Sequence, residues 1–181
     1  MNETLPPLPI VKAGHPALRR PAAPIADPTA DEWRKLAAQM VASLREAGGV
    51  GLAAPQVGVE ARLVMFYVPP HRITDRPDDT VCDLTILCNP VIEPLDDEQV
   101  EGWEGCLSLP DLRGLVPRFQ RIRYSGIQLD GERLVREVGG FHARVVQHEC
   151  DHLDGTLYPQ RMRDIRSLVY ADELIAAGGL T

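Results

Sequence analysis

The chain has 181 residues, of which 44% are hydrophobic and 25% are charged, and its formal net charge is −7. These values are typical of one globular domain that buries a core, and they exclude a largely disordered chain. The negative charge argues against a protein that binds nucleic acid mainly through its phosphates, because such a protein needs a basic face.

The N-terminal residues do not resemble an export signal. Residues 1–7 contain no basic stretch followed by an apolar one, and no apolar run in the chain approaches the ~18–20 residues of a membrane span. We therefore expect a cytoplasmic protein that does not enter the membrane. In that compartment the chain's four cysteines are expected to be free thiols: Cys82, Cys88, Cys106 and Cys150.

The first predicted element is a helix over residues 29–47, where apolar residues recur at helical intervals. Thr29 and Glu32 have the spacing of a capping box, and Gly48 follows the last periodic residue. The sequence therefore predicts both ends of this helix.

Strands are predicted next, beginning with the continuous apolar run at residues 61–68. Residues 69–83 are rich in Pro and Asp and predict a surface loop. Further strands are predicted at residues 84–92, 99–109, 121–129 and 132–138, with Asp130-Gly131 as the hairpin turn before the last.

A second helix is predicted over residues 141–153, where Phe141, Val145, His148 and His152 fall on one face. The segment at about residues 163–181 is predicted to be partly helical, with weak caps. Strands without regular βαβ alternation indicate an α+β fold, in one domain spanning residues 1–181. We expect mixed or antiparallel strands packed around the second helix.

This helix carries the motif His148-Glu149-Cys150-Asp151-His152, an H-E-x-x-H. Histidines four residues apart lie one above the other, so both imidazoles can reach one cation. Glu149 is offset by about 100° around the helix axis, where it can reach a water on the metal instead. The motif therefore predicts a catalytic metal site.

Such a site needs a third protein ligand and an open position for water. Tyr158 occupies the place of the last histidine in the longer pattern H-E-x-x-H-x-x-G-x-x-H, and tyrosine is a poor ligand. A carboxylate some twenty residues on, Asp172 or Glu173, is one candidate, and Cys106 is another. Spacing alone does not choose among them.

Three segments together resemble the peptide deformylase family. They are GVGLAAPQ at residues 49–56, EGCLS at 104–108 and QHECDHLDG at 147–155, in the family's order. The resemblance covers most of the chain and is weakest before about Ile10 and after about Met162. It implies a hydrolase that removes the formyl group from the N-terminal formyl-methionine of nascent polypeptides and releases formate.

The resemblance also implies roles for individual residues. Cys106, His148 and His152 would bind one divalent metal, most often Fe(II) in this family, with Zn, Ni or Co able to replace it. Glu149 would act as general base and then as general acid. The side-chain amide of Gln56 and the backbone N–H of Leu107 would stabilise the oxyanion.

The same resemblance suggests the substrate contacts. Gly51 would pair with the substrate backbone, and the methionine pocket is expected to be lined by Val50, Phe141 and Val145. Arg144 is also expected at the substrate site, where it departs from the apolar residue of many bacterial relatives. Glu104 and Arg113 are expected to form an ion pair that supports the Cys106 loop. Contact with the ribosome is conceivable through three C-terminal arginines, although a solvated face of mixed charge is favoured there: Arg161, Arg163 and Arg166.

Other functions stay open at this point. A zinc endopeptidase would use a carboxylate such as Glu173 in place of Cys106. A cysteine amidase would use Cys106 as nucleophile with His148 as its base, but Glu149 would then have no task. A protein that binds formylated N-termini without turnover would keep the metal as a structural element.

Overall fold

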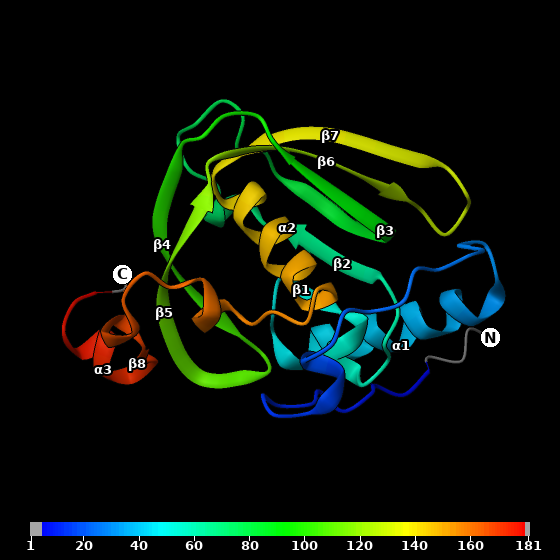
Figure 1. Cartoon of the computed structure of the whole chain (residues 1–181), viewed down its shortest axis with the longest axis horizontal. Coiled ribbons are helices and arrows are strands. Elements are labelled where there is room, and N and C mark those ends of the chain that lie inside the picture. Colours follow the sequence, from blue (N-terminus) through cyan, green and yellow to red (C-terminus); the bar gives the residue numbers. More distant parts are fainter. Residues whose placement is uncertain (1–4, 180–181) are drawn as a thin grey trace.

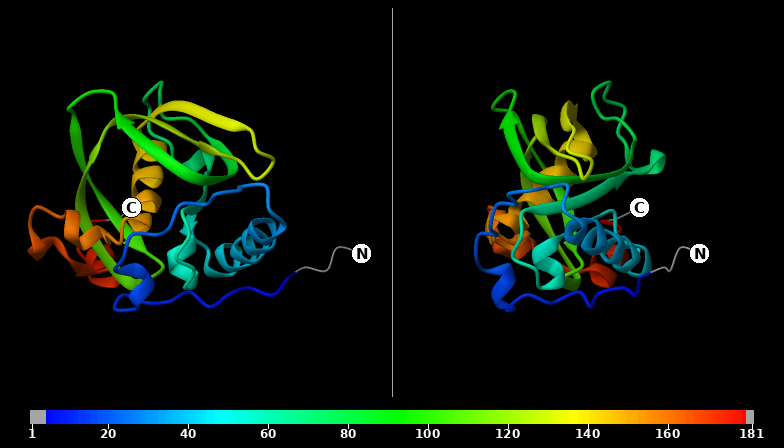
Figure 2. Two further views of the ribbon diagram at one scale, coloured as in Figure 1. Left: turned by 45° about the vertical axis from the view of Figure 1, so that its right-hand side comes forward. Right: turned by 90° about the vertical axis from the view of Figure 1, so that its right-hand side faces the viewer.

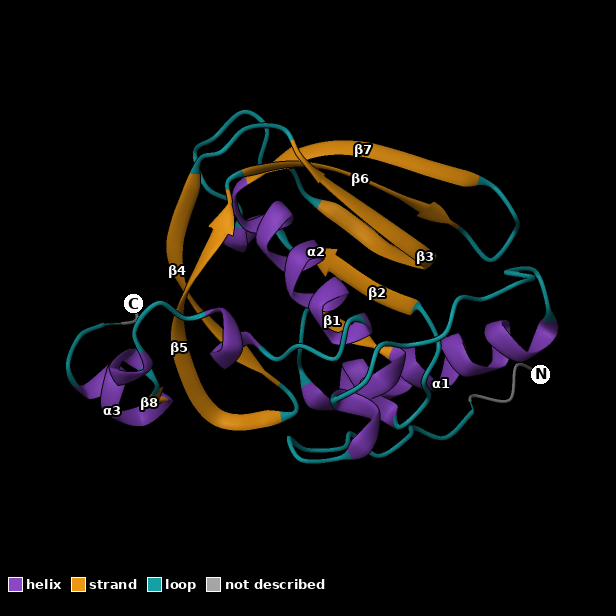
Figure 3. Ribbon diagram, viewed as in Figure 1, coloured by secondary structure: helices purple, strands orange, loops and turns teal. Residues whose placement is uncertain are grey.

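The structure is a computed structural model that describes residues 5–179. Its named strands pair antiparallel in two sheets (Figures 1 and 3). The five-stranded sheet has the order β1-β2-β3-β6-β7, with strands Gly51–Ala53, Leu63–Val68, Cys82–Pro94, Arg121–Ile127 and Arg133–Gly139 in chain order. The three-stranded sheet has the order β4-β5-β8, with strands Gln99–Cys106, Leu109–Phe119 and Val169–Tyr170.

In the described residues, three α-helices accompany the sheets: α1 (Asp31–Ala47), α2 (Gly140–Leu153) and α3 (Ala171–Ala176). Helix α2 lies between the five-stranded sheet and the β4–β5 hairpin (Figure 1). The Gln147 side chain fixes it to β5, because its amide accepts from the Phe119 N–H (3.0 Å) and donates to the Phe119 carbonyl (2.9 Å). The α+β fold with a central helix that carries the H-E-x-x-H motif is confirmed.

Strand β2 is apolar on both faces because a helix covers each of them. Val64 and Phe66 pack in the core that contains Val146 and Leu153 of α2. Leu63 and Met65 point the opposite way, into the core that contains Met40 and Leu44 of α1, as the two-residue period of a strand requires. A strand buried on both faces gives a continuous apolar run, which explains why the sequence predicted β2 well.

The predicted capping box of α1 is wrong. The helix begins at Asp31 after Ala30, and no side chain caps it. The Thr29 hydroxyl donates instead to the Asp27 carboxylate at 2.6 Å. The predicted C-terminal end is confirmed, because Gly48 takes the left-handed conformation (φ +68°) that ends many helices.

Strand β5 was not predicted. The expected strand at residues 99–109 ends at Cys106, and after a turn at Leu107 and Ser108 the chain returns as β5. Strand β5 contains Pro110 and Pro117, and Pro117 lies opposite Glu101 of β4. Proline donates no hydrogen bond to a ladder, so its presence argues against a strand when only the sequence is known.

The loop at residues 69–83, expected at the surface, contains the buried side chain of Asp79. Its carboxylate accepts from the N–H groups of Phe141 (2.9 Å) and His142 (3.1 Å) at the start of α2. These N–H groups have no partner within the helix, so the loop caps the helix that carries the motif.

The C-terminal segment is less helical than predicted. Of residues 163–179, only α3 is α-helical, and it follows the short strand β8 and a 3-10 turn at Ile165–Ser167. The last two residues of the predicted segment lie outside the described residues. Within residues 5–179, no helix combines the length and the apolar character that crossing a membrane requires.

Candidate metal centre

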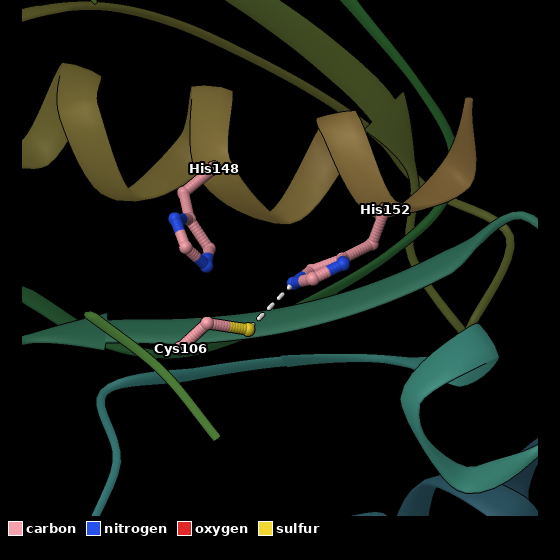
Figure 4. Close-up of side chains that lie close together, drawn as sticks. All are labelled: Cys106, His148 and His152. Carbon is pink, nitrogen blue, oxygen red and sulfur yellow. Dashed lines mark hydrogen bonds between the residues drawn. The ribbon is translucent and has the colours of Figure 1, made fainter. Parts of the chain in front are cut away.

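The side chains of Cys106, His148 and His152 converge between β4 and α2 (Figure 4). Their ligand atoms all lie within 4.8 Å of one another, and the Cys106 Sγ is 3.4 Å from the His152 Nε2. Cys106 comes from the last residue of β4, whereas the two histidines lie one turn apart on α2. The structure therefore brings together the three residues that the sequence predicted as ligands.

These residues fit a divalent metal. Bonds of about 2.3 Å to sulfur and 2.0–2.1 Å to nitrogen, at a tetrahedral angle, would put the two ligand atoms about 3.5 Å apart. The observed separation between sulfur and the His152 nitrogen is 3.4 Å. One thiolate and two imidazoles leave a fourth position open, as a catalytic site requires.

The two histidines have different surroundings. Burial, together with the positive charge of nearby groups, holds the pKa of His152 well below its ordinary value, so its imidazole is neutral. The Nδ1 atom of His148 lies 2.9 Å from the Glu104 Oε2, which leaves its Nε2 atom for the metal side. A carboxylate on the far nitrogen of a metal-binding histidine fixes the ring's tautomer and orientation.

The predicted ion pair between Glu104 and Arg113 is wrong for the described residues. Arg118 pairs with Glu104 through two nitrogens at 2.9 Å each, whereas the Arg113 guanidinium donates to the Leu112 carbonyl. The hairpin register explains the difference, because Glu104 lies opposite Gly114. Arg118 is an even number of residues from Gly114 and shares its face of the strand, whereas Arg113 points the other way.

Glu104 is ionised in this setting. Burial alone would raise the pKa of its carboxyl group, but hydrogen bonds from Arg118 and His148 outweigh burial and lower that pKa well below its ordinary value. Arg118 also donates to Asp151 at 2.6 Å, and Arg161 donates to the other oxygen of Asp151 at 2.8 Å. A chain of charges, buried from Glu104 to Asp151, thus supports the far side of His148, and no role was predicted from the sequence for Arg118 or Asp151.

Glu149 lies beside the cluster with one oxygen free. Its Oε2 is buried and has no hydrogen-bond partner among residues 5–179. A Cβ on Gly51 would come within 2.2 Å of the Glu149 Oε1, so glycine at position 51 makes room for this carboxylate. Burial raises the pKa of Glu149 to about 7.

Gln56 presents its amide nitrogen to the same space. The Nε2 atom lies 3.5 Å from the Cys106 Sγ and 3.3 Å from the Ser108 Oγ, while the Oε1 atom accepts from the Ala53 N–H at 2.8 Å. Leu107 occupies the turn directly after Cys106, outside the β4–β5 ladder. The two predicted oxyanion donors therefore flank Cys106 from different segments.

The N-terminal segment contacts the backbone of Gln56 and of Ser108, the residue after Leu107, which the sequence did not reveal. The Val11 N–H donates to the Gln56 carbonyl, and the Ala13 N–H donates to the Ser108 carbonyl, each at 2.8 Å. This segment runs along the outside of the molecule before α1 (Figure 2). Contacts between segments so distant in the chain have no local sequence signal.

The residues predicted for the methionine pocket have different surroundings. Val50 and Phe141 are partly buried against the core that includes Val145. The Arg72 guanidinium lies over the Phe141 ring, 4.3 Å from its centroid. The Arg144 guanidinium turns toward β4 and β5, where it contacts Glu104 at 2.8 Å.

The other candidate third ligands do not take part. Asp172 and Glu173 are exposed on α3, whereas the group of candidate ligands found among residues 5–179 contains Cys106. Tyr158 is buried and stacks on His148, with ring centroids 6.2 Å apart. All four cysteines are free, as predicted.

Known proteins are similar to this chain over most of its length. Residues 7–167 match the family model described as polypeptide deformylase. The chain is 54% identical to "Peptide deformylase 1" of Bordetella pertussis over 165 residues, which cover 91% of this chain and 93% of that protein. It is 46% identical to "Peptide deformylase 1" of Nitrosomonas europaea over 166 residues, 92% of this chain and 93% of that protein.

A solved structure extends the similarity to three dimensions. The Met-Ala-Ser-bound crystal structure of class I type b peptide deformylase from Acinetobacter baumannii has a TM-score of 0.77 and 36% sequence identity. The match covers 88% of this chain and 99% of that one. The matched family region includes all three motifs that the sequence analysis singled out.

Proposed function

This chain belongs to the polypeptide deformylase family, whose members hydrolyse the formyl group from peptide N-termini, and we propose how its own residues perform that reaction. The proposal assigns Cys106, His148 and His152 as the ligands of one divalent metal. The observation that carries it is their convergence beside Glu149, whose buried Oε2 has no hydrogen-bond partner in the described part of the chain.

When bound, the metal supplies Lewis-acid activation of a water molecule and of the formyl carbonyl. Glu149 takes the proton of the attacking water and then delivers it to the leaving amine. Its position next to Gly51 supports this role, because the carboxylate occupies the space that a Cβ at residue 51 would fill and its Oε2 atom has no hydrogen-bond partner among residues 5–179. The products are formate and a free N-terminal amine.

Attack on the formamide places negative charge on the formyl oxygen. The Gln56 Nε2 and the Leu107 N–H are the proposed donors to that oxygen. Gln56 is 1% exposed, and its other amide atom is fixed by Ala53, so the donor needs little reorganisation.

The native metal is proposed to be Fe(II). The ligand set of one thiolate and two imidazoles suits Fe(II) and Zn(II) alike, so Zn, Ni or Co would also occupy the site. A thiolate-bound Fe(II) would make the activity sensitive to oxygen and peroxide.

The proposed substrates are N-formyl-methionyl nascent peptides, met in the cytoplasm. The open edge of β1 beside Glu149 supports binding of an extended peptide along Gly51, with the methionine side chain directed toward Val50, Phe141 and Val145. Ribosome contact through Arg161, Arg163 and Arg166 stays a prediction. Each of these arginines lies within 4.0 Å of a carboxylate, which disfavours RNA binding.

The test is formate release from a formyl-Met tripeptide by protein reconstituted anaerobically with Fe(II), compared with Glu149→Gln. The variant keeps the volume of the side chain but cannot accept a proton, so a loss of about 100- to 10,000-fold in kcat is expected. Equal metal content in both proteins is the control. A Glu149→Gln variant as active as the wild type would exclude Glu149 as the base, and cleavage of internal peptide bonds would support the endopeptidase instead.

A further inference from the structure

Arg144 lies on α2 one turn before His148, and its side chain crosses to the β4–β5 hairpin. Its Nη2 atom donates to the Val100 carbonyl at 2.7 Å, and its Nη1 atom donates to the Val116 carbonyl at 2.9 Å. The side chain is 14% exposed. Backbone groups of both strands therefore hold this guanidinium in place.

Gly102 of β4 provides the space that the guanidinium occupies. A Cβ at position 102 would lie 2.8 Å from the Arg144 Cζ and Nη2 atoms, closer than side chains pack. Gly102 faces Val116 across the hairpin, so any larger residue would point into the same gap. The absence of a side chain at Gly102 thus makes room for the Arg144 guanidinium.

From this position the Arg144 guanidinium contacts Glu104. Arg144 Nη1 donates to the Glu104 Oε1 at 2.8 Å, and the Glu104 Oε2 lies 2.9 Å from the His148 Nδ1. Arg118, the other cation on Glu104, is shared with Asp151. Among residues 5–179, Glu104 is the only carboxylate that pairs with Arg144. Unlike Arg118, Arg144 therefore does not share its charge with a second carboxylate.

We propose that Arg144, seated on Gly102, is a positioning residue that holds Glu104 in the orientation that fixes the His148 ring toward the metal. The inference rests on the proposed metal site. It adds a contact between α2 and β4 that reaches the ligands through Glu104, without touching substrate or metal. Partners of metal-binding histidines typically change metal affinity or activity by about 10- to 100-fold when they are removed.

The experiment follows Co(II) in the loaded protein, because Co(II) reports its ligand geometry by visible absorption. Wild type, Arg144→Met, Gly102→Ala and the double variant are mixed with excess EDTA, and the rate of Co(II) loss is measured. Release about 10- to 100-fold faster is expected for both single variants, together with a shifted Co(II) spectrum. The double variant should release Co(II) no faster than Arg144→Met, because both changes remove the same contact.

Arg62→Met is the matched control, because Arg62 is also a partly buried arginine paired with a carboxylate, Asp154, at 2.8 Å. It should release Co(II) at the wild-type rate. Circular dichroism establishes that each variant is folded. Arg144→Lys keeps the charge, but its single ammonium group cannot bridge Val100, Val116 and Glu104 as the planar guanidinium does. This variant replaces Arg144→Met if Arg144→Met does not fold.

Three results would overturn the inference. The first is a folded Arg144 variant that keeps the wild-type release rate and spectrum. The second is a double variant in which the two single effects multiply, because the two sites would then be independent. Wild-type protein that binds Co(II) without a thiolate charge-transfer band would overturn the metal site itself and this inference with it. Normal wild-type binding with unaffected variants would overturn the inference alone.

Discussion

Among single residues, Gln56 is fixed through one atom of its amide and is proposed to act through the other. Its Oε1 accepts from the Ala53 N–H, and its Nε2 faces Cys106. Gln56→Glu keeps the acceptor for Ala53 but lacks the Nε2 donor. We expect its kcat to fall by about 100- to 1,000-fold, as when one oxyanion donor is removed.

The measurement is steady-state formate release, beside Gln56→Ala as the variant that loses the hydrogen bonds of both amide atoms. If the donor matters, Gln56→Glu and Gln56→Ala should be similarly slow, and the melting temperature should fall mainly in Gln56→Ala. Activity near wild type in Gln56→Glu would show that Gln56 serves the fold only.

His142, also on α2, is a buried histidine that the proposed chemistry does not use. Its Nδ1 lies 3.0 Å from the Thr80 carbonyl and its Nε2 lies 3.1 Å from the Tyr124 hydroxyl, which suits a neutral ring. Burial, with a further contribution from Arg136, lowers the pKa of His142 below its ordinary value of 6.5, although Asp79 and the Thr80 carbonyl oppose this.

This pKa shift predicts a pH dependence of stability. Because the unfolded chain binds the proton more readily than the folded protein, the contribution of His142 to the free energy of unfolding is complete above about pH 6.5. It decreases as the pH falls from there toward the lowered pKa of the folded state. Urea unfolding of metal-free protein between pH 7.5 and 5.5 should show a shallower pH dependence for His142→Gln than for wild type. Equal slopes would contradict the prediction.

At the scale of elements, the start of α2 depends on a loop rather than on its own residues. Asp79 accepts from two N–H groups there, and it also accepts from the Thr74 N–H at 2.8 Å. Replacing a capping side chain with alanine typically costs about 0.5–2 kcal/mol. We therefore expect Asp79→Ala to lower the free energy of unfolding by at least about 1 kcal/mol, measured by urea unfolding.

Asp78→Ala is the matched control for Asp79→Ala. The Asp78 carboxylate pairs with Arg76 and Arg121 near the surface, and exposed pairs contribute about 0–1 kcal/mol. The cap assignment predicts the larger loss for Asp79→Ala. An equal loss in both variants would show that the loop contributes as a whole and that the cap itself adds little.

The elements also show which parts of the fold were predictable from the sequence. Strand β2 was predictable because burial on both faces leaves a continuous apolar run, and helix α2 was predictable because burial of one stripe leaves a periodic pattern. Strand β5 was not, because Pro110 and Pro117 argue against a strand, and only the pairing with β4 overrides them. The Asp79 cap depends on a contact between segments more than sixty residues apart, for which the local sequence carries no signal.

The residues of the candidate site also differ in how far the sequence could predict them. Helical spacing alone placed His148, His152 and Glu149, whereas the third ligand required the family motif around Cys106. Alternation along the hairpin could have identified Arg118 as the partner of Glu104, had β5 been predicted. The role proposed for Arg144 required the structure, because it depends on space above Gly102.

At the scale of the whole molecule, the candidate ligands join two parts of the fold. Cys106 ends β4 in the three-stranded sheet, whereas His148 and His152 belong to α2, which packs on the five-stranded sheet. A metal held by all three would cross-link these parts in the folded state only. Removing it should therefore destabilise the protein as well as inactivate it.

The thermodynamic linkage between metal binding and folding determines how large this destabilisation is. A ligand that binds only the folded state stabilises it by about 2.7 kcal/mol at a free concentration 100 times its Kd. For a chain of this length, about 2–4 °C in Tm corresponds to each kcal/mol, so a difference of roughly 5–11 °C between metal-loaded and metal-free protein is expected. Differential scanning calorimetry at fixed free Zn(II) measures it. In Cys106→Ser the difference should shrink strongly, since the bond from β4 is lost while both histidines remain. A difference as large in Cys106→Ser as in wild type would mean that the metal is held by α2 alone and does not join the two sheets.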